Sequence, residues 1–247
     1  MKNRGLLVAA GALVVSALAA GVWFAPLPYL TQQPGPPIDT LGGDVITISG
    51  ADTSASTGRL LLTTIQVSDD VDVATAVRTW FDHTEALVPR TAVFPGGRDE
   101  EQVRQANQAS FDTASRNAIT AALSRSTHPT GVRVKVSLAD IGGPSAGLMI
   151  TLGIIDKLTP ADLTGGQVIA GTGELAPDGA VGPIGGIPQK LTAAERAGAR
   201  YFLVPADNCA EAVPVAPPGL TLARVATVDE ALAALKAIAA GTPPGPC

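Results

Sequence analysis

The sequence predicts an α+β fold, and three observations support this class. Segments typical of strands occur at 44–49 and 60–67, and apolar and polar residues alternate at 132–136 as in a half-buried strand. Helices are predicted at 99–124, 145–158 and 189–197, and another begins after Thr227. The strands and helices do not follow the regular alternation that a doubly wound parallel sheet requires. With 247 residues, 46% of them hydrophobic, the chain can form a substantial core.

The composition excludes several classes of protein. With two Cys and two His, the chain is neither a disulfide-rich mini-protein nor a structural zinc module. Its net charge is −5, and Lys2 and Arg4 are the only charged residues before Asp39. The acidic body argues against nucleic acid and against anionic lipid as the main partners.

The N-terminal region has the pattern of a membrane anchor. Residues 5–25 are apolar except for Ser16 and the indole of Trp23, and as a helix they would span roughly 31 Å. Lys2 and Arg4 precede the run, so the positive-inside rule places the body on the extracytoplasmic side. We therefore expect residues 1–30 to form a cytoplasmic stub and a single transmembrane helix in the cell membrane. The alternative is a signal peptide cleaved near residues 17–19, although the run is long for that.

The first part of the body is predicted to contain a linker and two strands. Residues 31–41 include glutamines, a glycine and three prolines and read as a linker. Residues 44–49 and 60–67 read as strands joined by a loop at 51–58. At 132–136, three valines alternate with Arg133 and Lys135, which indicates a strand with one polar face.

The remaining elements follow from breakers and caps. Residues 99–124 contain few breakers and a weak apolar stripe, whereas 145–158 are apolar on nearly every side and predict a buried helix. A hairpin is expected at 167–182 around the turn at 177–179, and a short strand at 201–204. Gly198 would close the helix at 189–197. Thr227 and Glu230 form a capping-box pattern before the last helix, which leaves 239–247 as a C-terminal tail.

Both cysteines, Cys209 and Cys247, would lie in a compartment that permits disulfides if the body is exported. We expect them to pair and to tie the tail to the domain. Two unpaired cysteines are the alternative.

A candidate nucleophile lies in the segment Gly143-Pro144-Ser145-Ala146-Gly147, between a predicted strand and the buried helix. The G-x-S-x-G pattern suggests an α/β-hydrolase elbow, but that family needs its histidine after the serine. His83 and His128 both precede Ser145, which excludes this order. A triad with the histidine first stays open, although nothing local supports it.

A neutral lysine could instead deprotonate Ser145. Lys190 differs from the other lysines because it follows the small and apolar residues 181–189 at the start of a helix, where it can be desolvated. Lowering a lysine pKa from about 10.4 to near 7 requires roughly 4–5 kcal/mol, which burial can supply. Backbone N–H groups at the start of the Ser145 helix could bind an oxyanion.

Three separated motifs together resemble the Lon peptidase domain. They are the segment 143–147, Gly171-Thr172-Gly173-Glu174, and 182–191. Ser145 and Lys190 stand 45 residues apart, in the order and spacing of that family. The resemblance covers most of residues 42–238, although 68–100 match poorly, and it implies a ribosomal protein S5 domain 2-like fold for 42–238.

The resemblance implies an ATP-independent serine endopeptidase with a Ser–Lys dyad. Ser145 would be the nucleophile, Lys190 the general base, and Thr172 a partner that orients Lys190. Gly143, Pro144 and Ala146 would support the oxyanion loop. Within the family the chain resembles the membrane-anchored actinobacterial type that lacks the ATPase, and the motif at 208–212 fits that group. Unfolded proteins or peptides are then the expected substrates, and a homo-oligomer stays open.

Two departures from the family pattern favour an alternative. The family has an acidic residue directly before Gly-Pro-Ser, where this chain has Gly142, with Asp140 two positions earlier. The membrane-anchored relatives also carry a PDZ domain, for which only residues 124–131 are available here. A catalytically inactive scaffold or binding protein on the same fold is therefore the alternative. A serine hydrolase acting on small esters, indifferent to Lys190, is a third reading.

Other motifs in the sequence lack the neighbouring elements that cofactor or metal binding requires, so no cofactor or metal is expected. Residues 171–173 resemble a dinucleotide-binding turn, but a hairpin follows instead of a helix, and 182–190 lack the Gly-Lys-Ser/Thr of a P-loop. Glu174 could take part in the active site, or it could only form a structural hydrogen bond. Trp80 and Phe81 are expected in the core, and His128 in an exposed loop.

Overall fold

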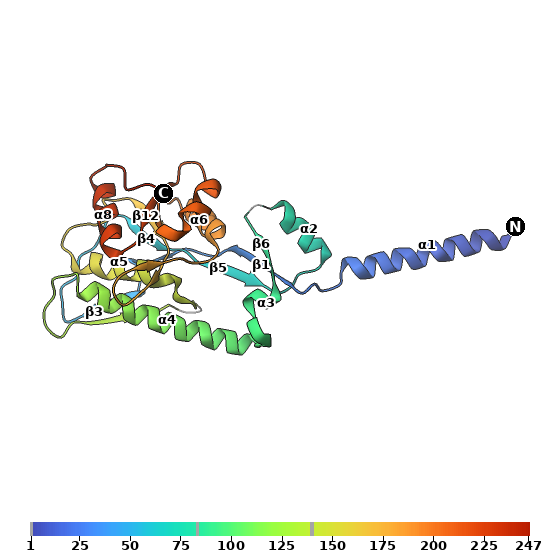
Figure 1. The fold of residues 1–247 in the computed structure, drawn as a ribbon, viewed down its shortest axis with the longest axis horizontal. Coiled ribbons are helices and arrows are strands. Elements are labelled where there is room, and N and C mark those ends of the chain that lie inside the picture. The colour runs from blue at the N-terminus through green and yellow to red at the C-terminus, as the bar shows by residue number, and fades with distance from the viewer. Residues whose placement is uncertain (1, 83, 139–140) are drawn as a thin grey trace. The chain divides into compact units, whose positions relative to one another are not determined.

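The computed structural model describes residues 2–82, 84–138 and 141–247. The chain forms two compact units: Met1–Gln33 with Gln66–Gly97, and Pro34–Ile65 with Arg98–Cys247 (Figure 1). The mixture of helices and strands confirms the predicted α+β class. The chain leaves the first unit at residue 33 and returns to it at residue 66. Such a return is set by strand pairing between distant segments, which has no local sequence signal.

The first unit contains a three-stranded sheet of order β5-β1-β6. Strand β1 pairs antiparallel with β6 through partners such as Leu30 and Val88. The predicted linker at 31–41 is therefore partly strand, since it contributes to β1 and to β2 of the second unit. Helix α2 begins at the N-cap Asp72, whose side chain accepts from the Thr75 N–H at 2.7 Å. The elements of this unit are α1 (Lys2–Trp23), β1 (Tyr29–Pro34), β5 (Ile65–Ser68), α2 (Val73–Phe81), β6 (Ala86–Pro89), α3 (Arg90–Val93) and the 3₁₀ turn η1 (Pro95–Gly97).

Two expectations for the first unit are not supported. Helix α1 covers most of the apolar run at 5–25. Across the described residues, however, no helix combines the length and the apolar character that a membrane crossing requires, so the predicted anchor lacks support. Trp80 and Phe81, predicted in the core, are 78% and 77% exposed. Their neighbour Thr79 is the buried residue of α2, and successive helical residues point about 100° apart, so the next two side chains turn away from the packed face.

The second unit is built on a five-stranded sheet of order β12-β11-β8-β4-β2. The first four strands are mutually parallel, and β2 is antiparallel to β4. The predicted hairpin at 167–182 is only partly correct: β9 and β10 form it, whereas β8 lies in the large sheet. The strands of this unit are β2 (Ile38–Asp39), β3 (Ile46–Ser49), β4 (Arg59–Leu62), β7 (Arg133–Val136), β8 (Val168–Gly171), β9 (Glu174–Leu175), β10 (Val181–Gly182), β11 (Tyr201–Pro205) and β12 (Thr221–Val225).

Helices cover both faces of this sheet, because its strands alternate their side chains between two apolar clusters. Leu203 joins the cluster that contains residues of α4, α5 and α8, whereas its neighbours Phe202 and Val204 join the cluster that contains residues of α6 and α7. The helices and 3₁₀ turns are α4 (Glu100–Leu123), η2 (Pro144–Ala146), α5 (Gly147–Leu158), α6 (Ile187–Arg196), η3 (Ala206–Asn208), α7 (Cys209–Ala212), η4 (Val213–Val215) and α8 (Val228–Ala239).

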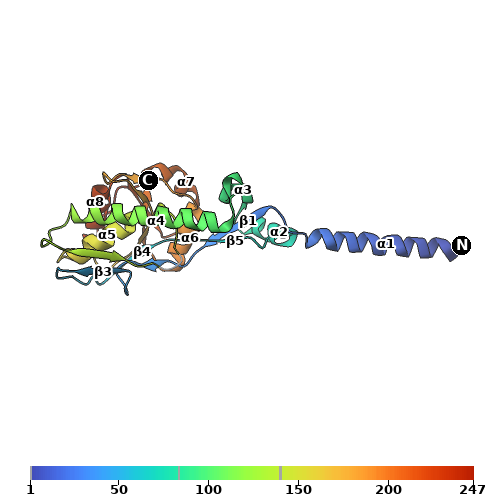
Figure 2. The same ribbon diagram turned by 90° about the horizontal axis from the view of Figure 1, so that it is seen from below.

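Helix α4 runs uninterrupted beside α5 (Figure 2). It begins with a capping box in which the Asp99 side chain accepts from the Gln102 N–H at 2.8 Å. Ser115 lies on its buried face, and within the described part of the chain its hydroxyl is the one buried side-chain group without a hydrogen-bond partner. An unsatisfied hydroxyl in an apolar interface lowers the stability of the folded state.

Replacing Ser115 by Ala is therefore expected to raise the free energy of unfolding by about 1 kcal/mol. Ser110 on the same helix is the matched control, because its hydroxyl donates to the Ala106 carbonyl at 2.9 Å. Chemical denaturation of both variants provides the measurement. A lower stability for Ser115→Ala than for Ser110→Ala would show that the Ser115 hydroxyl is satisfied in solution.

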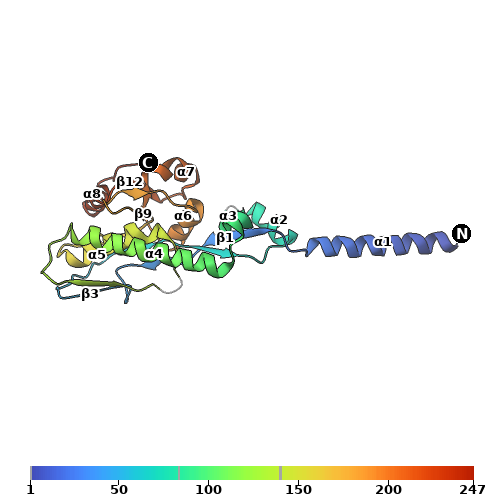
Figure 3. The same ribbon diagram turned by 60° about the horizontal axis from the view of Figure 1, so that its bottom comes forward.

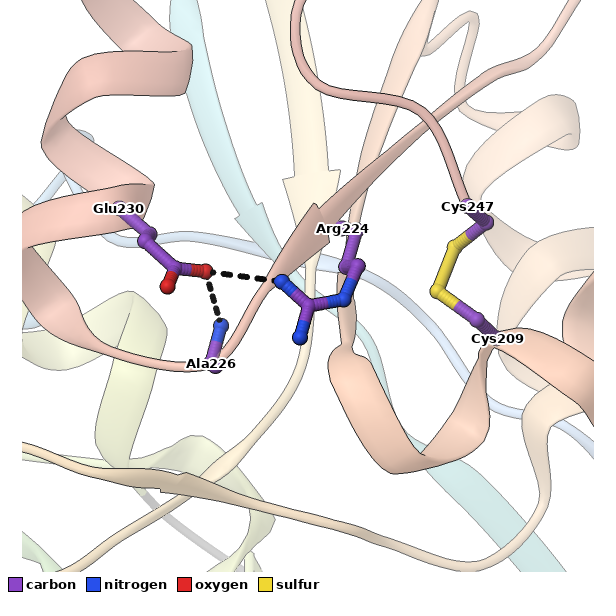
Figure 4. Close-up of a disulfide and its surroundings, with 5 residues drawn as sticks. All are labelled: Cys209, Arg224, Ala226, Glu230 and Cys247. Carbon is purple, nitrogen blue, oxygen red and sulfur yellow. Dashed lines mark hydrogen bonds and ion pairs between the residues drawn. A yellow bond between two sulfur atoms is a disulfide. The ribbon is translucent and has the colours of Figure 1, made fainter.

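The C-terminal tail is attached to the second unit by a covalent and a backbone link. Cys209 and Cys247 form a disulfide across 38 positions of sequence. The Arg224 N–H donates to the Gly245 carbonyl at 2.9 Å, so the tail lies along the edge strand β12. Figure 3 shows the C-terminus beside β12 and α7, and Figure 4 shows the disulfide close to Arg224, which pairs with Glu230 at 3.3 Å.

Candidate functional site

Ser145 lies in the middle of the 3₁₀ turn η2, directly before α5. Gly143 precedes it with φ of 91°, a conformation that glycine adopts without strain, and its N–H donates to the Asn107 carbonyl of α4 at 2.8 Å. At Gly147 the backbone passes so close to β9 that a Cβ would lie 2.8 Å from the Leu175 Cβ. The glycines of this motif therefore serve the tight turn and the close packing around Ser145.

Lys190 lies in the first turn of α6, and only 2% of its surface is exposed. Its amine donates a hydrogen bond to the Thr172 hydroxyl at 3.0 Å. Thr172 is fully buried just after β8, and its hydroxyl donates to the Ser145 carbonyl at 3.2 Å. The Gly173 N–H donates to the same carbonyl at 3.0 Å. The fold therefore links three distant segments, around residues 145, 172 and 190, through one short hydrogen-bonded chain.

Burial lowers the pKa of Lys190 from 10.5 to about 8. Burial is the cause because the charged ammonium loses its hydration, and no charged neighbour contributes to the shift. Within the described residues, Lys190 also forms no ion pair with a carboxylate. At pH 7 about a tenth of such a lysine is neutral, whereas an ordinary lysine is almost wholly charged. Lys190 can therefore act as a base near neutral pH.

Gly142 occupies the position at which the Lon pattern has an acidic residue. A Cβ at Gly142 would lie 2.8 Å from the Asn107 Cβ of α4, so this helix approaches too closely for a side chain there. Asp140 and His83 lie outside the described residues. His128, predicted in an exposed loop, is half-buried, and its ring contacts the Leu123 carbonyl at 3.1 Å.

A cavity of about 310 Å³ opens beside the serine turn, between α4 and β9. Six of its lining residues are Ser110, Thr113, Asn117, Pro144, Glu174 and Leu175. Pro144 directly precedes Ser145, and Glu174 is exposed at the cavity. The cavity is large enough to receive a substrate side chain beside Pro144. Glu174, whose role the sequence left open, lines this cavity.

Asn208 is a buried residue near the site to which sequence reasoning assigned no role. Its Oδ1 accepts from the Ile184 N–H at 2.9 Å, and its Nδ2 donates to the Ile184 carbonyl at 3.0 Å. Ile184 lies in the connection between β10 and α6, six residues before Lys190. Asparagine commonly bonds backbone groups in turns, but only the fold identifies which backbone it meets.

Metal binding has no candidate site in the ranges that the structure describes. No three or more His, Cys, Asp or Glu side chains gather there in an arrangement that could hold an ion.

Residues 104–237, which include all three site segments, match the family of the Lon protease (S16) C-terminal proteolytic domain. The Lon protease of Azospirillum brasilense is 40% identical over 93 residues, which cover 36% of this chain and 11% of that protein. The Lon protease of Roseiflexus castenholzii is 31% identical over 156 residues, 59% of this chain and 19% of that protein. Lon protease 2 of Bacillus subtilis is 36% identical over 94 residues, 37% of this chain and 16% of that protein. The matches span less than a fifth of the length of these relatives.

Proposed function

Because this chain belongs to the family of the Lon protease (S16) C-terminal proteolytic domain, we propose that it is an ATP-independent serine endopeptidase with a Ser145–Lys190 dyad. The observation that carries the proposal is the buried Lys190 amine, bonded at 3.0 Å to a hydroxyl that itself bonds the Ser145 carbonyl. The sequence relatives support proteolysis, and this arrangement favours Ser145 as the nucleophile and Lys190 as the general base.

In the first half of the reaction, the neutral Lys190 amine takes the proton from the Ser145 hydroxyl as Oγ attacks the peptide carbonyl carbon. Ser145 and Ala146 lie in the first turn of a helix, where backbone N–H groups lack helical acceptors and can stabilise the developing oxyanion. When the C–N bond breaks, the Lys190 ammonium returns its proton to the leaving amine. The product is an acyl-enzyme on Ser145.

In the second half, water attacks the acyl carbonyl while Lys190 accepts its proton. The tetrahedral intermediate then collapses, the bond to Oγ breaks, and the proton passes back from Lys190 to Ser145. Thr172 accepts a hydrogen bond from Lys190 at 3.0 Å throughout, which keeps the amine directed toward the serine turn.

The expected substrates are unfolded proteins or peptides. The cavity beside Pro144 has a volume of about 310 Å³, which suits a substrate side chain and is far too small for a folded domain. The disulfide between Cys209 and Cys247 supports action outside the reducing cytoplasm, because such bonds persist in oxidising compartments.

A scaffold without activity is the second candidate, and Gly142 favours it because the acidic residue of the Lon pattern is absent. The hydrogen bonding of Lys190 argues against it, since Lys190 bonds a hydroxyl rather than a neutralising carboxylate. A buried lysine with a lowered pKa in the absence of a carboxylate partner is typical of a functional site.

The decisive experiment incubates the purified 247-residue chain with an unfolded protein, without nucleotide and with a metal chelator. We expect cleavage at internal peptide bonds, unchanged by added ATP or chelator. Product termini mapped by mass spectrometry would identify endopeptidase cuts. A folded chain that cleaves nothing would favour the scaffold, and activity that requires nucleotide or metal would contradict the proposed mechanism.

A further inference from the structure

The connection between β10 and α6 has no helix or strand at residues 183–186, and its Ile184 side chain packs against the apolar cluster that contains residues of α6 and α7. It contains Gly185 and Gly186, and Gly186 adopts φ of 74°, in the left-handed region. Helix α6 begins immediately afterwards. At its start the Lys190 N–H donates a hydrogen bond to the Gly186 carbonyl at 3.0 Å. The direction in which α6 starts, and hence the place of the Lys190 side chain, depends on how this connection is held.

Both backbone polar groups of Ile184, at the centre of this connection, are bonded to one side chain. The carboxamide of Asn208 accepts from the Ile184 N–H at 2.9 Å and donates to the Ile184 carbonyl at 3.0 Å. The carboxamide thereby makes the two backbone hydrogen bonds that a neighbouring strand would make in a sheet. Asn208 Nδ2 also donates to Glu211 Oε2 at 3.2 Å, which is consistent with this orientation of the amide.

Asn208 is itself firmly anchored. It is only 6% exposed, and it follows β11 by three residues. The next residue, Cys209, is bonded to Cys247, whose tail lies along β12 (Figure 4). Asn208 is therefore fixed to two adjacent strands of the large sheet, one through the backbone and one through the disulfide.

We propose that Asn208 is a positioning residue, which fixes the Ile184 backbone and thereby places Lys190 against Thr172 in the buried site. The proposal rests on the proposed function for its catalytic consequence. Hydrogen bonds weaken steeply beyond about 3.5 Å, so a shift of about 1 Å at the start of α6 would break the bond of 3.0 Å between Lys190 and Thr172. The same shift would admit water to the amine.

The test compares Asn208→Ala with Asn208→Asp, Glu211→Ala and Thr40→Val. The Asp variant keeps the volume but removes the donor to the Ile184 carbonyl. Glu211→Ala removes the third bond of the carboxamide and leaves both Ile184 bonds. Thr40→Val removes a buried hydrogen bond of 3.1 Å to the Leu60 carbonyl, a contact that involves none of the site residues, and controls for lost stability.

For both Asn208 variants we expect kcat to fall about 10- to 100-fold with little change in KM. Asn208→Ala should also raise the pKa of Lys190 by about one pH unit or more, since the amine becomes hydrated. The two control variants should keep both values. Because the chain has five lysines, the Lys190 pKa can be followed directly by NMR of ¹³Cε-labelled lysine, assigned with Lys190→Met.

Unchanged kcat and an unchanged Lys190 pKa in both folded Asn208 variants would overturn the proposal. An equal pKa shift in Thr40→Val would also overturn it, because the effect would then be general. If Asn208→Ala does not fold, the isosteric Asn208→Asp variant tests the proposal instead. Its kcat, or the distance between the Lys190 amine and the Thr172 hydroxyl in its crystal structure, is then the measurement. If the wild type cleaves nothing but Asn208→Ala still shifts the Lys190 pKa, the proposed function fails and the positioning role stands.

Discussion

Replacing Lys190 by Met is expected to lower kcat/KM for peptide cleavage by at least about 10³-fold, with a comparable loss for Ser145→Ala. Either change removes a group that the acyl transfer needs, and methionine keeps nearly the volume of the lysine side chain. The double variant should be hardly worse than either single one, because the two groups act as a unit. Single-turnover cleavage of an unfolded substrate is the measurement.

The pH dependence of the wild type follows from the pKa of Lys190. Because only the neutral amine accepts a proton, kcat/KM should rise with pH and level off above about 8. A lysine exposed to water would shift this rise of kcat/KM to a pH near 10.5. A rise of kcat/KM near the pKa of an ordinary histidine would contradict the dyad, and so would activity that survives Lys190→Met. Either result would favour the hypothesis of a small-ester hydrolase.

The same variant separates loss of chemistry from loss of fold. The folded-state pKa of Lys190 lies below its unfolded value, so the buried ammonium destabilises the folded state at any pH below about 8. The penalty is on the order of 3 kcal/mol and disappears as pH rises toward 10.5. At pH 7, Lys190→Met should therefore be more stable than the wild type. Lys236→Met, at an exposed position of α8, should leave stability unchanged.

Breaking the disulfide is the second large expected effect. Replacing Cys247 by Ser should lower the free energy of unfolding by about 4 kcal/mol, because the unfolded chain is no longer closed across 38 positions. Denaturant unfolding of the oxidised wild type and of the variant provides the measurement. Cys209→Ser should give the same loss, since either change opens the same loop.

Arg224→Gln is the matched control for the disulfide. It removes the exposed pair with Glu230 close to the same tail, and such surface pairs contribute at most about 1 kcal/mol. Because the tail keeps its backbone bond between Arg224 and Gly245 in all these variants, the difference between them measures the covalent link. A Cys247→Ser variant no less stable than Arg224→Gln would show that the tail contributes little to folding.

Local sequence features predicted the elements that depend on local physical chemistry. The capping pattern at Thr227 marks the start of α8, and the apolar residues after Ser145 form the buried helix α5. In β7 the alternation of Arg133 and Lys135 with valines matches the exposure of those two side chains. Caps, periodicity and turn residues act within a few positions, so a single sequence carries them.

Features that depend on partners distant in sequence were missed or misjudged. The assignment of β8 to the large sheet and the strands within the predicted linker depend on pairing across many residues. The exposure of Trp80 and Phe81 depends on which face of a short helix is packed.

For the candidate site, the sequence by itself determined the identities of its groups: a serine at a glycine-rich turn, a threonine in a Gly-Thr-Gly segment and a lysine at a helix start. The family resemblance implied that Thr172 orients Lys190, but the tertiary structure alone decided that Thr172 also bonds the Ser145 carbonyl and that Asn208 bonds the Ile184 backbone. It also decided the burial that lowers the Lys190 pKa to about 8. The physical reason is that desolvation and hydrogen bonding depend on distances between segments, and only the packed chain sets those distances.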